Sequence, residues 1–525
     1  MRRNFQQLEN GPFDLLVIGG GIYGAWIAYD AVLRGLHVAL IEQRDWASGT
    51  SSASSKLIHG GLRYLEYGWL ELVRKSLKER KSLWDLAPHR VFFQEFIIPI
   101  YNFSRWSRWS TFLGLCCYDF LAGNKKSFYN QQYFSKELLS KQFPFLSSTG
   151  LRGGFQYMDG ATDDARLTLE IVHGAHQHGA VVVNYAKAIQ LISNHKQVLG
   201  VCIQDELNDR TIEVSANTIV NATGSWVQTL GSALSGSALK VKYTKGVHLV
   251  LPQLEKRQAF LLTSPKDQRV FFLIPWYGRT LLGTTDTPYN QDPGNVLVED
   301  GDVEYLLNSI SPFLDRQGWN VSHILGSFAG LRTLVDSSNK KPSGLKRDWM
   351  IQKEADNYWV SLGGKLSSAR ADAIVLVDQV CSFLGRTDIS GLANRVFPWC
   401  PVSSMNEFLE DVLKQASPYH LDDDQVSTLV RRYGKHVHDV FVIIQKNPEL
   451  RGRIVSDLPF CWAEIIYTVQ HEMACTLKDV LRRRIPLLIL ARVSHDVIER
   501  VARLMASAIG WTEQRIQMEI ASILQ

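Results

Sequence analysis

Three glycines near the N-terminus have the spacing of a phosphate-binding turn. Gly19, Gly21 and Gly24 follow an apolar run at residues 15–18 and precede an alanine-rich helical pattern. The first glycine permits a tight turn, the second lets backbone approach a pyrophosphate, and the third lets the helix pack against the strand. Phosphate oxygens would accept hydrogen bonds from the free N–H groups at the helix N-terminus.

A carboxylate completes this unit. A second apolar run, residues 37–41, ends on Glu42, which lies about 20 residues beyond the first glycine, where an acid accepts from ribose hydroxyls. Strand, helix, strand and acid together predict a dinucleotide-binding βαβ unit. The alternative is a glycine-rich turn in an ordinary α/β sheet.

Two later segments also place small residues at the ends of predicted strands. Ala222, Thr223 and Gly224 close one strand, and Gly363 and Gly364 close another. Ligands of open parallel sheets lie at the carboxyl ends of the strands. Each segment alone is equally a plain turn, but all three in this order favour FAD over NAD, because FAD-binding chains of this kind return late to their first sheet.

Composition narrows the class of protein. The chain has 525 residues, enough for two or three domains, with 45% hydrophobic and 21% charged residues. The net charge of +5 suits an anionic substrate or membrane surface, and there is no basic stripe or stacking surface for nucleic acid. The seven cysteines include no C-x-x-C pair, which predicts no metal site and a reducing cytoplasm. We expect neither a signal peptide nor a membrane-spanning segment.

The character of the chain changes near residues 390–402. Before that point, strands, glycine turns and helices alternate, whereas residues 405–525 are almost wholly helical in pattern. The sequence therefore predicts an α/β part followed by a helical part.

Several motifs together carry a resemblance to a known family. The chain resembles the FAD-dependent, aerobic, quinone-linked glycerol-3-phosphate dehydrogenases from about residue 13 to about residue 485. The motifs are IGGGIYG, SSASSKLIHGGLRYLE, DDARL, VNATGSWV, KGVHLV, IPWYGRTLLGTTD, GLRTL, GGKLSS and YTVQHEMACTLKDVLRRR.

The resemblance implies a fold and a division of the chain. It implies a Rossmann-type FAD-binding domain of the D-amino-acid-oxidase-like (glutathione-reductase-like) class, with a β-rich substrate domain and an all-α C-terminal domain. We expect residues 1–395 to form the oxidoreductase region and 396–525 the helical domain. The FAD-binding segments would be about 13–70, 160–235 and 345–390, and the substrate-domain segments about 71–159 and 236–344.

The resemblance also implies a reaction and its residues. Glycerol 3-phosphate would lose hydride to flavin, giving dihydroxyacetone phosphate. A substrate dianion needs fixed cations, for which Arg63, Arg332 and Lys365 are the candidates, and Tyr64 and Thr284 would donate hydroxyl hydrogen bonds. His248 is the candidate general base, and Arg332 is the alternative that would polarise the hydroxyl. Further FAD contacts carried over from the family motif are Ser54, Ser55, Lys56, Gly60 and Gly61.

The chain departs from the family pattern in places. Tyr23 and Trp26 are bulky on the first helix, Thr333 stands where proline is common, and GGKLSSAR and IPLLILA replace the usual residues. Two alternatives therefore stay open: a flavin oxidase of another hydroxy acid or amine that uses oxygen, or a non-catalytic FAD-binding protein that acts through its helical domain.

A segment rich in arginine and tryptophan indicates where in the cell the protein is expected. Residues 105–113, RWSRWSTFL, suit a lipid headgroup layer, although a buried helix with snorkelling arginines fits the pattern equally well. With ubiquinone or another quinone as acceptor, we expect a cytoplasmic protein attached peripherally to the inner face of the cell membrane. The second basic stretch, Arg482 to Arg484, is interpreted as a membrane contact or a solvated helix end. A homodimer is compatible with the sequence.

Overall fold

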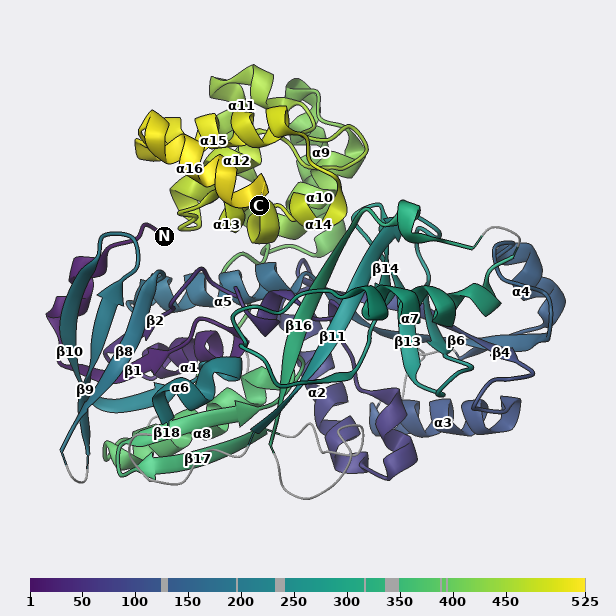
Figure 1. Ribbon diagram of the computed structural model, residues 1–525, viewed down its shortest axis with the longest axis horizontal. Coiled ribbons are helices and arrows are strands. Elements are labelled where there is room, and N and C mark those ends of the chain that lie inside the picture. Colours follow the sequence, from purple (N-terminus) through teal and green to yellow (C-terminus); the bar gives the residue numbers. More distant parts are fainter. Residues whose placement is uncertain are drawn as a thin grey trace.

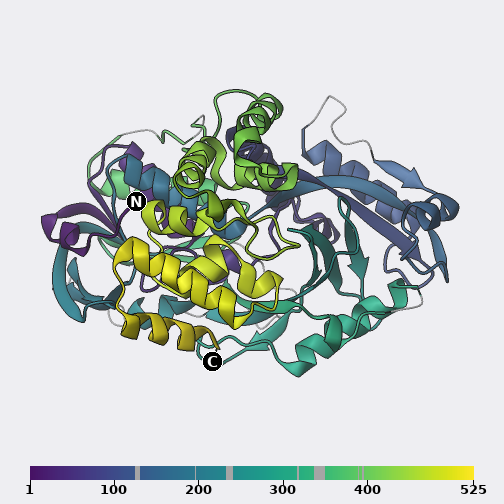
Figure 2. The same cartoon turned by 90° about the horizontal axis from the view of Figure 1, so that it is seen from above.

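The computed structural model describes residues 1–123, 131–194, 197–231, 241–315, 318–335, 349–387, 390–392 and 395–524. Two sheets stand side by side, and a group of helices covers them on one side (Figures 1 and 2).

In these residues the first sheet has eight strands, and its centre is parallel, in the order β18-β10-β1-β2-β7. Its strands are β1 (Phe13–Ile18), β2 (Val38–Ile41), β7 (Val181–Val183), β8 (Ala186–Ser193), β9 (Val198–Asp205), β10 (Arg210–Asn221), β17 (Trp349–Ala355) and β18 (Tyr358–Gly363). Most residues of the central strands are buried, because helices or other strands cover both faces.

Three helices pack around this parallel centre. Helix α1 (Ile22–Leu33) lies against α5 (Asp164–Gln177) and α8 (Ala369–Phe383). The α5 helix begins as the acid-rich sequence predicts, with the Asp163 carboxylate accepting from the Arg166 N–H at 3.2 Å.

The second sheet is larger and mostly antiparallel, with ten strands in the described ranges. They are β3 (Leu57–Ile58), β4 (Val91–Tyr101), β5 (Gln132–Phe134), β6 (Leu151–Thr162), β11 (Val241–Pro252), β12 (Ala259–Thr263), β13 (Val270–Trp276), β14 (Arg279–Gly283), β15 (Thr287–Tyr289) and β16 (Gly326–Val335). The helices connected with it are α2 (Leu70–Leu86), α3 (Arg108–Leu121), α4 (Lys136–Gln142) and α7 (Asp300–Ile310), and the short α6 (Val227–Gly231) follows β10.

The remaining helices, drawn green to yellow, form the cover over both sheets (Figure 1). They are α9 (Met405–Ala416), α10 (Asp423–Tyr433), α11 (Val437–Lys446), α12 (Ala463–His471), α13 (Leu477–Asp479), α14 (Leu487–Leu490), α15 (His495–Ile509) and α16 (Glu513–Leu524). Among the described residues, every helix is too short or too polar to span a bilayer.

The second basic stretch is not on the surface, so both interpretations of it were wrong. Arg483 is 7% exposed and Arg484 is 1% exposed, in a π-helical turn at Val480–Arg484. Both guanidinium groups bind the buried carboxylate of Asp45, at 2.6 Å from Arg483 and 2.7 Å from Arg484. The basic run therefore joins the helical cover to the loop after β2.

Candidate active site

Strand register brings the three glycine-containing segments together. Ile18 of β1 pairs with Asn221 of β10, and Asn221 pairs with Val360 of β18. The residues that follow each strand therefore meet at one edge of the sheet. They line one large cavity with the turn after β1.

The turn after β1 has the geometry that its glycines predict. A Cβ on Gly24 would overlap the carbonyl oxygen of Gly19, and Gly19 has a φ of +112° and lies against the backbone of Ala222. Gly21 ends the turn, where a Cβ would meet only Ser51 Oγ at 3.1 Å. The cavity therefore reaches the backbone at the start of α1, as a pyrophosphate requires.

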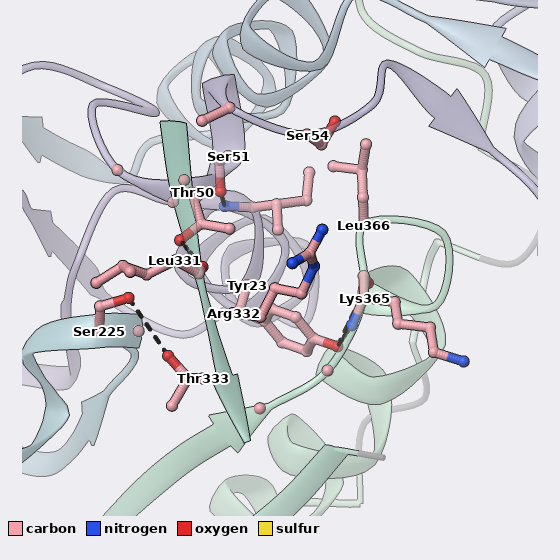
Figure 3. Close-up of a pocket in the computed structure, with 18 of the residues that line it drawn as sticks. Tyr23, Thr50, Ser51, Ser54, Ser225, Leu331, Arg332, Thr333, Lys365 and Leu366 are labelled. Carbon is pink, nitrogen blue, oxygen red and sulfur yellow. Dashed lines mark hydrogen bonds between the residues drawn. The ribbon is translucent and has the colours of Figure 1, made fainter. Parts of the chain in front are cut away.

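Polar groups around this turn also fit a dinucleotide. Glu42 is buried and accepts from the N–H groups of Gly20 at 2.7 Å and Arg44 at 2.9 Å. Ser51 Oγ accepts from the Ile22 N–H at 2.9 Å (Figure 3). Burial is the main cause that raises the pKa of Glu42. Ser51 is not among the residues expected from the sequence, although it lies in the serine-rich loop that follows β2.

A second group of predicted residues surrounds Tyr64. The Lys365 ammonium lies 4.1 Å and the Arg63 guanidinium carbon 5.1 Å from the centre of the Tyr64 ring. Although burial opposes the charge of Arg63, nearby Tyr64 and Asp286 raise its pKa. These side chains line the same cavity as the glycine turn.

Arg332 belongs to a neighbouring polar group in that cavity, which Asp286 links to Arg63. Its guanidinium donates to Asp286 Oδ1 at 3.0 Å and to Thr284 Oγ1 at 3.0 Å. A Cβ on Gly246 would overlap the guanidinium, so this glycine leaves the space that Arg332 fills. The predicted cationic residues thus share a cavity, but Asp286, which was not expected from the sequence, neutralises part of the charge of Arg332. The position of Asp286 at the end of the motif LLGTTD is the feature of the sequence that could have pointed to it.

His248 is held in a fixed orientation at the wall of the cavity. Its Nε2 lies 2.9 Å from Ser55 Oγ, and its ring stacks on Phe328 with centroids 4.8 Å apart. No hydrogen-bond partner reaches its Nδ1 from the described residues. Burial, followed by the charges of Arg332 and Lys56, lowers the pKa of His248 to about 3, so the ring is neutral at physiological pH.

Most predicted residues line the cavity and a few do not. The residues that line it are Gly19, Gly21, Glu42, Ser54, Ser55, Gly61, Arg63, Tyr64, Ala222, Thr223, Gly224, His248, Thr284, Arg332, Gly363, Gly364 and Lys365. Gly24, Lys56 and Gly60 are not among the residues that line the cavity. Lys56 is buried against Asp164 at 2.5 Å, and Gly60 leaves room for Leu77 and Tyr118.

The unusual residues near the cavity have structural partners. The Tyr23 hydroxyl donates to Asp372 at 2.7 Å and accepts from the Lys365 N–H at 3.0 Å, in space that Gly364 leaves free (Figure 3). The Thr333 hydroxyl lies 3.4 Å from that of Ser225. Tyr23 and Thr333 thus line the cavity with hydroxyl groups that already have hydrogen-bond partners.

The parallel sheet, the glycine turn and the cavity that runs from it to polar side chains on a second sheet define an FAD-dependent oxidoreductase. The family model described as FAD dependent oxidoreductase matches residues 14–369, and the model described as the C-terminal domain of alpha-glycerophosphate oxidase matches residues 403–516. An aerobic glycerol-3-phosphate dehydrogenase of Staphylococcus aureus (strain USA300) is 34% identical over 491 residues, which are 91% of this chain and 87% of the relative. The chain therefore belongs to the FAD-dependent glycerol-3-phosphate dehydrogenase family, and its cofactor is FAD.

Solved structures agree with this assignment. A glycerol-3-phosphate dehydrogenase from Bacillus halodurans complexed with FAD superposes with a TM-score of 0.81 and 28% identity, covering 99% of this chain and 95% of that chain. An L-alpha-glycerophosphate oxidase from Mycoplasma pneumoniae shares the fold, with a TM-score of 0.56 and 18% identity over 74% of this chain and 99% of that chain. The predicted fold class and cofactor are confirmed.

Proposed function

We propose that this protein oxidises sn-glycerol 3-phosphate to dihydroxyacetone phosphate and passes the electrons to a membrane quinone. The observation that carries the proposal is the position of Arg63, Lys365, Arg332 and His248, which line one cavity with the dinucleotide turn. Clustered cations favour a phosphate ester over an amine, because an ammonium substrate would be repelled.

The phosphate would bind to the cations around Tyr64. Arg63 and Lys365 approach the Tyr64 ring, and a phosphate dianion would accept charge-assisted hydrogen bonds from both. Arg332 is held by Asp286 and Thr284 and would orient the substrate from another wall of the cavity.

His248 would accept the proton of the C2 hydroxyl. Its ring is neutral at physiological pH and is fixed by Ser55 and Phe328, so a nitrogen lone pair is available. Bound FAD supplies the acceptor for the hydride that leaves C2. Because the His248 ring is buried, water has little access to this proton acceptor.

We also propose that helix α3 attaches the protein to the inner face of the cell membrane. Trp109 is 74% exposed, Leu113 63% and Phe120 83%, and these side chains lie along one face of the helix. Apolar side chains with neighbouring arginines suit the lipid headgroup layer. Trp106 is less suited, because it is partly buried and donates to Glu66.

The substrate assignment is tested by anaerobic reduction of the bound flavin. Stopped-flow absorbance should show rapid bleaching with glycerol 3-phosphate and very slow bleaching with glycerol, which lacks the phosphate. Equal rates with both compounds would exclude a role for the cationic cluster. Steady-state assays with a quinone or with oxygen would then identify the electron acceptor and separate a dehydrogenase from an oxidase.

A further inference from the structure

A second cavity lies where the helical cover meets the FAD-binding part. It is bounded by the loop after β2, by β16, by α13 and by the π-helical turn at Val480–Arg484. Several residues, among them Thr50, Gly330 and Leu331, line both this cavity and the one described above. The second cavity therefore borders the first and shares part of its wall.

Carboxylates that line the second cavity already have partners. Asp479 accepts from Arg483 and from the Tyr185 hydroxyl, both at 2.6 Å, and its other oxygen accepts two backbone N–H groups. Glu519 accepts from the Leu477 N–H at 2.8 Å and pairs with Arg515 at 2.6 Å. Both acids therefore already form ion pairs, Asp479 with Arg483 and Glu519 with Arg515.

Three cationic side chains line the cavity without such a partner. No carboxylate lies within 4.0 Å of Arg44, Lys478 or Arg482 in the part of the chain that the structure describes. The Arg44 guanidinium carbon lies 5.8 Å from the Trp226 ring centre, and nearby Asp292 accepts from the Gly294 N–H instead. Like charges are thus gathered here, and the nearest carboxylates, Asp164 for Arg482 and Asp479 for Lys478, act on them only from beyond ion-pair distance.

Arg482 is the most unusual of these side chains. Its Nη1 is buried and has no hydrogen-bond partner among the described residues, and its only close ring is Phe328, with a guanidinium–centroid distance of 5.6 Å. A buried guanidinium donor without an acceptor costs free energy, and an anion in the cavity that Arg482 lines would give this guanidinium group an acceptor. Burial and Arg483 lower the pKa of Arg482 to about 10, and burial followed by neighbouring arginines lowers the pKa of Lys478.

We infer that this cavity is a second binding site for a phosphate-bearing anion, held by Lys478 and Arg482 with help from Arg44. An arginine fork and a lysine point charge are the combination that phosphate groups prefer in proteins. Its cations differ from those proposed to bind the substrate, which line the first cavity.

Equilibrium dialysis of the FAD-loaded protein with labelled inorganic phosphate tests the inference. In an Arg332→Ala background, which weakens the substrate site, phosphate should still bind. Lys478→Gln or Arg482→Gln should then weaken the remaining binding about 10- to 100-fold, the usual worth of a charge-assisted hydrogen bond. Lys414→Gln is the matched control, because this side chain is exposed on α9 and lies 4.0 Å from Asp411.

Phosphate binding that is unchanged in Lys478→Gln would overturn the inference, as would the absence of phosphate binding in the Arg332→Ala background. Lys478 is exposed, so its variant should fold even where Arg482→Gln does not. Flotation on phosphatidylcholine vesicles with or without phosphatidic acid distinguishes the source of the anion. Loss of the phosphatidic-acid effect in Lys478→Gln would identify a lipid headgroup, and an unchanged effect would identify a free phosphate compound.

Discussion

At the scale of single residues, the buried position of His248 keeps its imidazole neutral. Its pKa of about 3 reflects burial first and the charges of Arg332 and Lys56 second. Because the pKa is lowered, the ring stays deprotonated across the neutral range and gains a proton only in acid. The rate of proton abstraction is therefore expected to fall as pH decreases through about 3, not near pH 6.5.

His248→Ala tests this role. Flavin reduction by glycerol 3-phosphate should slow by roughly 10²–10⁴-fold, the usual worth of a positioned proton acceptor. Stopped-flow absorbance under anaerobic conditions measures the rate. A control variant, His323→Ala, removes an exposed imidazole that is bonded to Asn320. An unchanged rate in His248→Ala would leave Arg332 as the group that acts on the hydroxyl.

Arg332→Ala should lower kcat/KM about 10- to 100-fold, because one charge-assisted contact is worth about 1.5–3 kcal/mol. The loss also leaves Asp286 without its guanidinium partner at 3.0 Å, so the carboxylate would repel a phosphate ester. The double variant Arg332→Ala/Asp286→Asn should therefore recover part of the activity. No recovery would indicate that Arg332 acts on the substrate and that Asp286 contributes little to the loss.

At the scale of elements, the close contact between α1 and the turn after β1 depends on one missing side chain. Gly24→Ala would place a methyl group on the Gly19 carbonyl oxygen. Such overpacking costs about 1–3 kcal/mol, and the turn must shift away from the pyrophosphate position. The purified variant should retain much less FAD by absorbance, whereas Gly301→Ala, in open space on α7, should retain it fully.

The exposed face of α3 identifies the side chains whose replacement tests the proposed membrane attachment. Replacing Trp109 and Leu113 with serine should move the protein from the membrane fraction to the supernatant and lower quinone reduction, while reduction of a soluble dye persists. Leu199→Ser, at a 48% exposed position on β9, is the matched control. Equal liposome flotation of wild type and the double variant would show that another surface makes the attachment.

At the scale of the whole molecule, Asp45 joins the cofactor loop to the helical cover. Although burial opposes its charge, Arg484 and Arg483 hold the pKa of Asp45 below its ordinary value. A lowered pKa contributes stability that is present above the ordinary value of about 3.9 and is lost as pH falls through the folded value.

Asp45→Asn should lower the free energy of unfolding at pH 7 by about 3–5 kcal/mol, because the buried Arg483 and Arg484 guanidinium groups share this carboxylate and each loses one of its charge partners. Calorimetry of the FAD-loaded protein from pH 7 to pH 3 should show the difference from wild type shrinking with acidity. Asp411→Asn, which is exposed on α9, should unfold as wild type does. A constant difference at all pH values would mean that the charge of Asp45 is not the cause.

The sequence alone determined much of this protein. The glycine spacing specified the turn after β1, because Gly19 needs a positive φ and Gly24 a contact that admits no Cβ. These are local requirements, so residues close in the chain reveal them. The family motifs in turn led to residues that line one cavity, although they lie on distant strands.

Only the tertiary structure decided which charged side chains are buried and which of them form ion pairs. Arg482 to Arg484 have the sequence of a solvated basic helix end, but Asp45, more than 400 residues earlier, makes burial of two of them possible. The partial neutralisation of Arg332 by Asp286 likewise depends on β11, which pairs with β16 on one side and with β15, just after Asp286, on the other. Charge pairs between distant segments leave no periodicity in the sequence, since each partner alone resembles an ordinary surface residue.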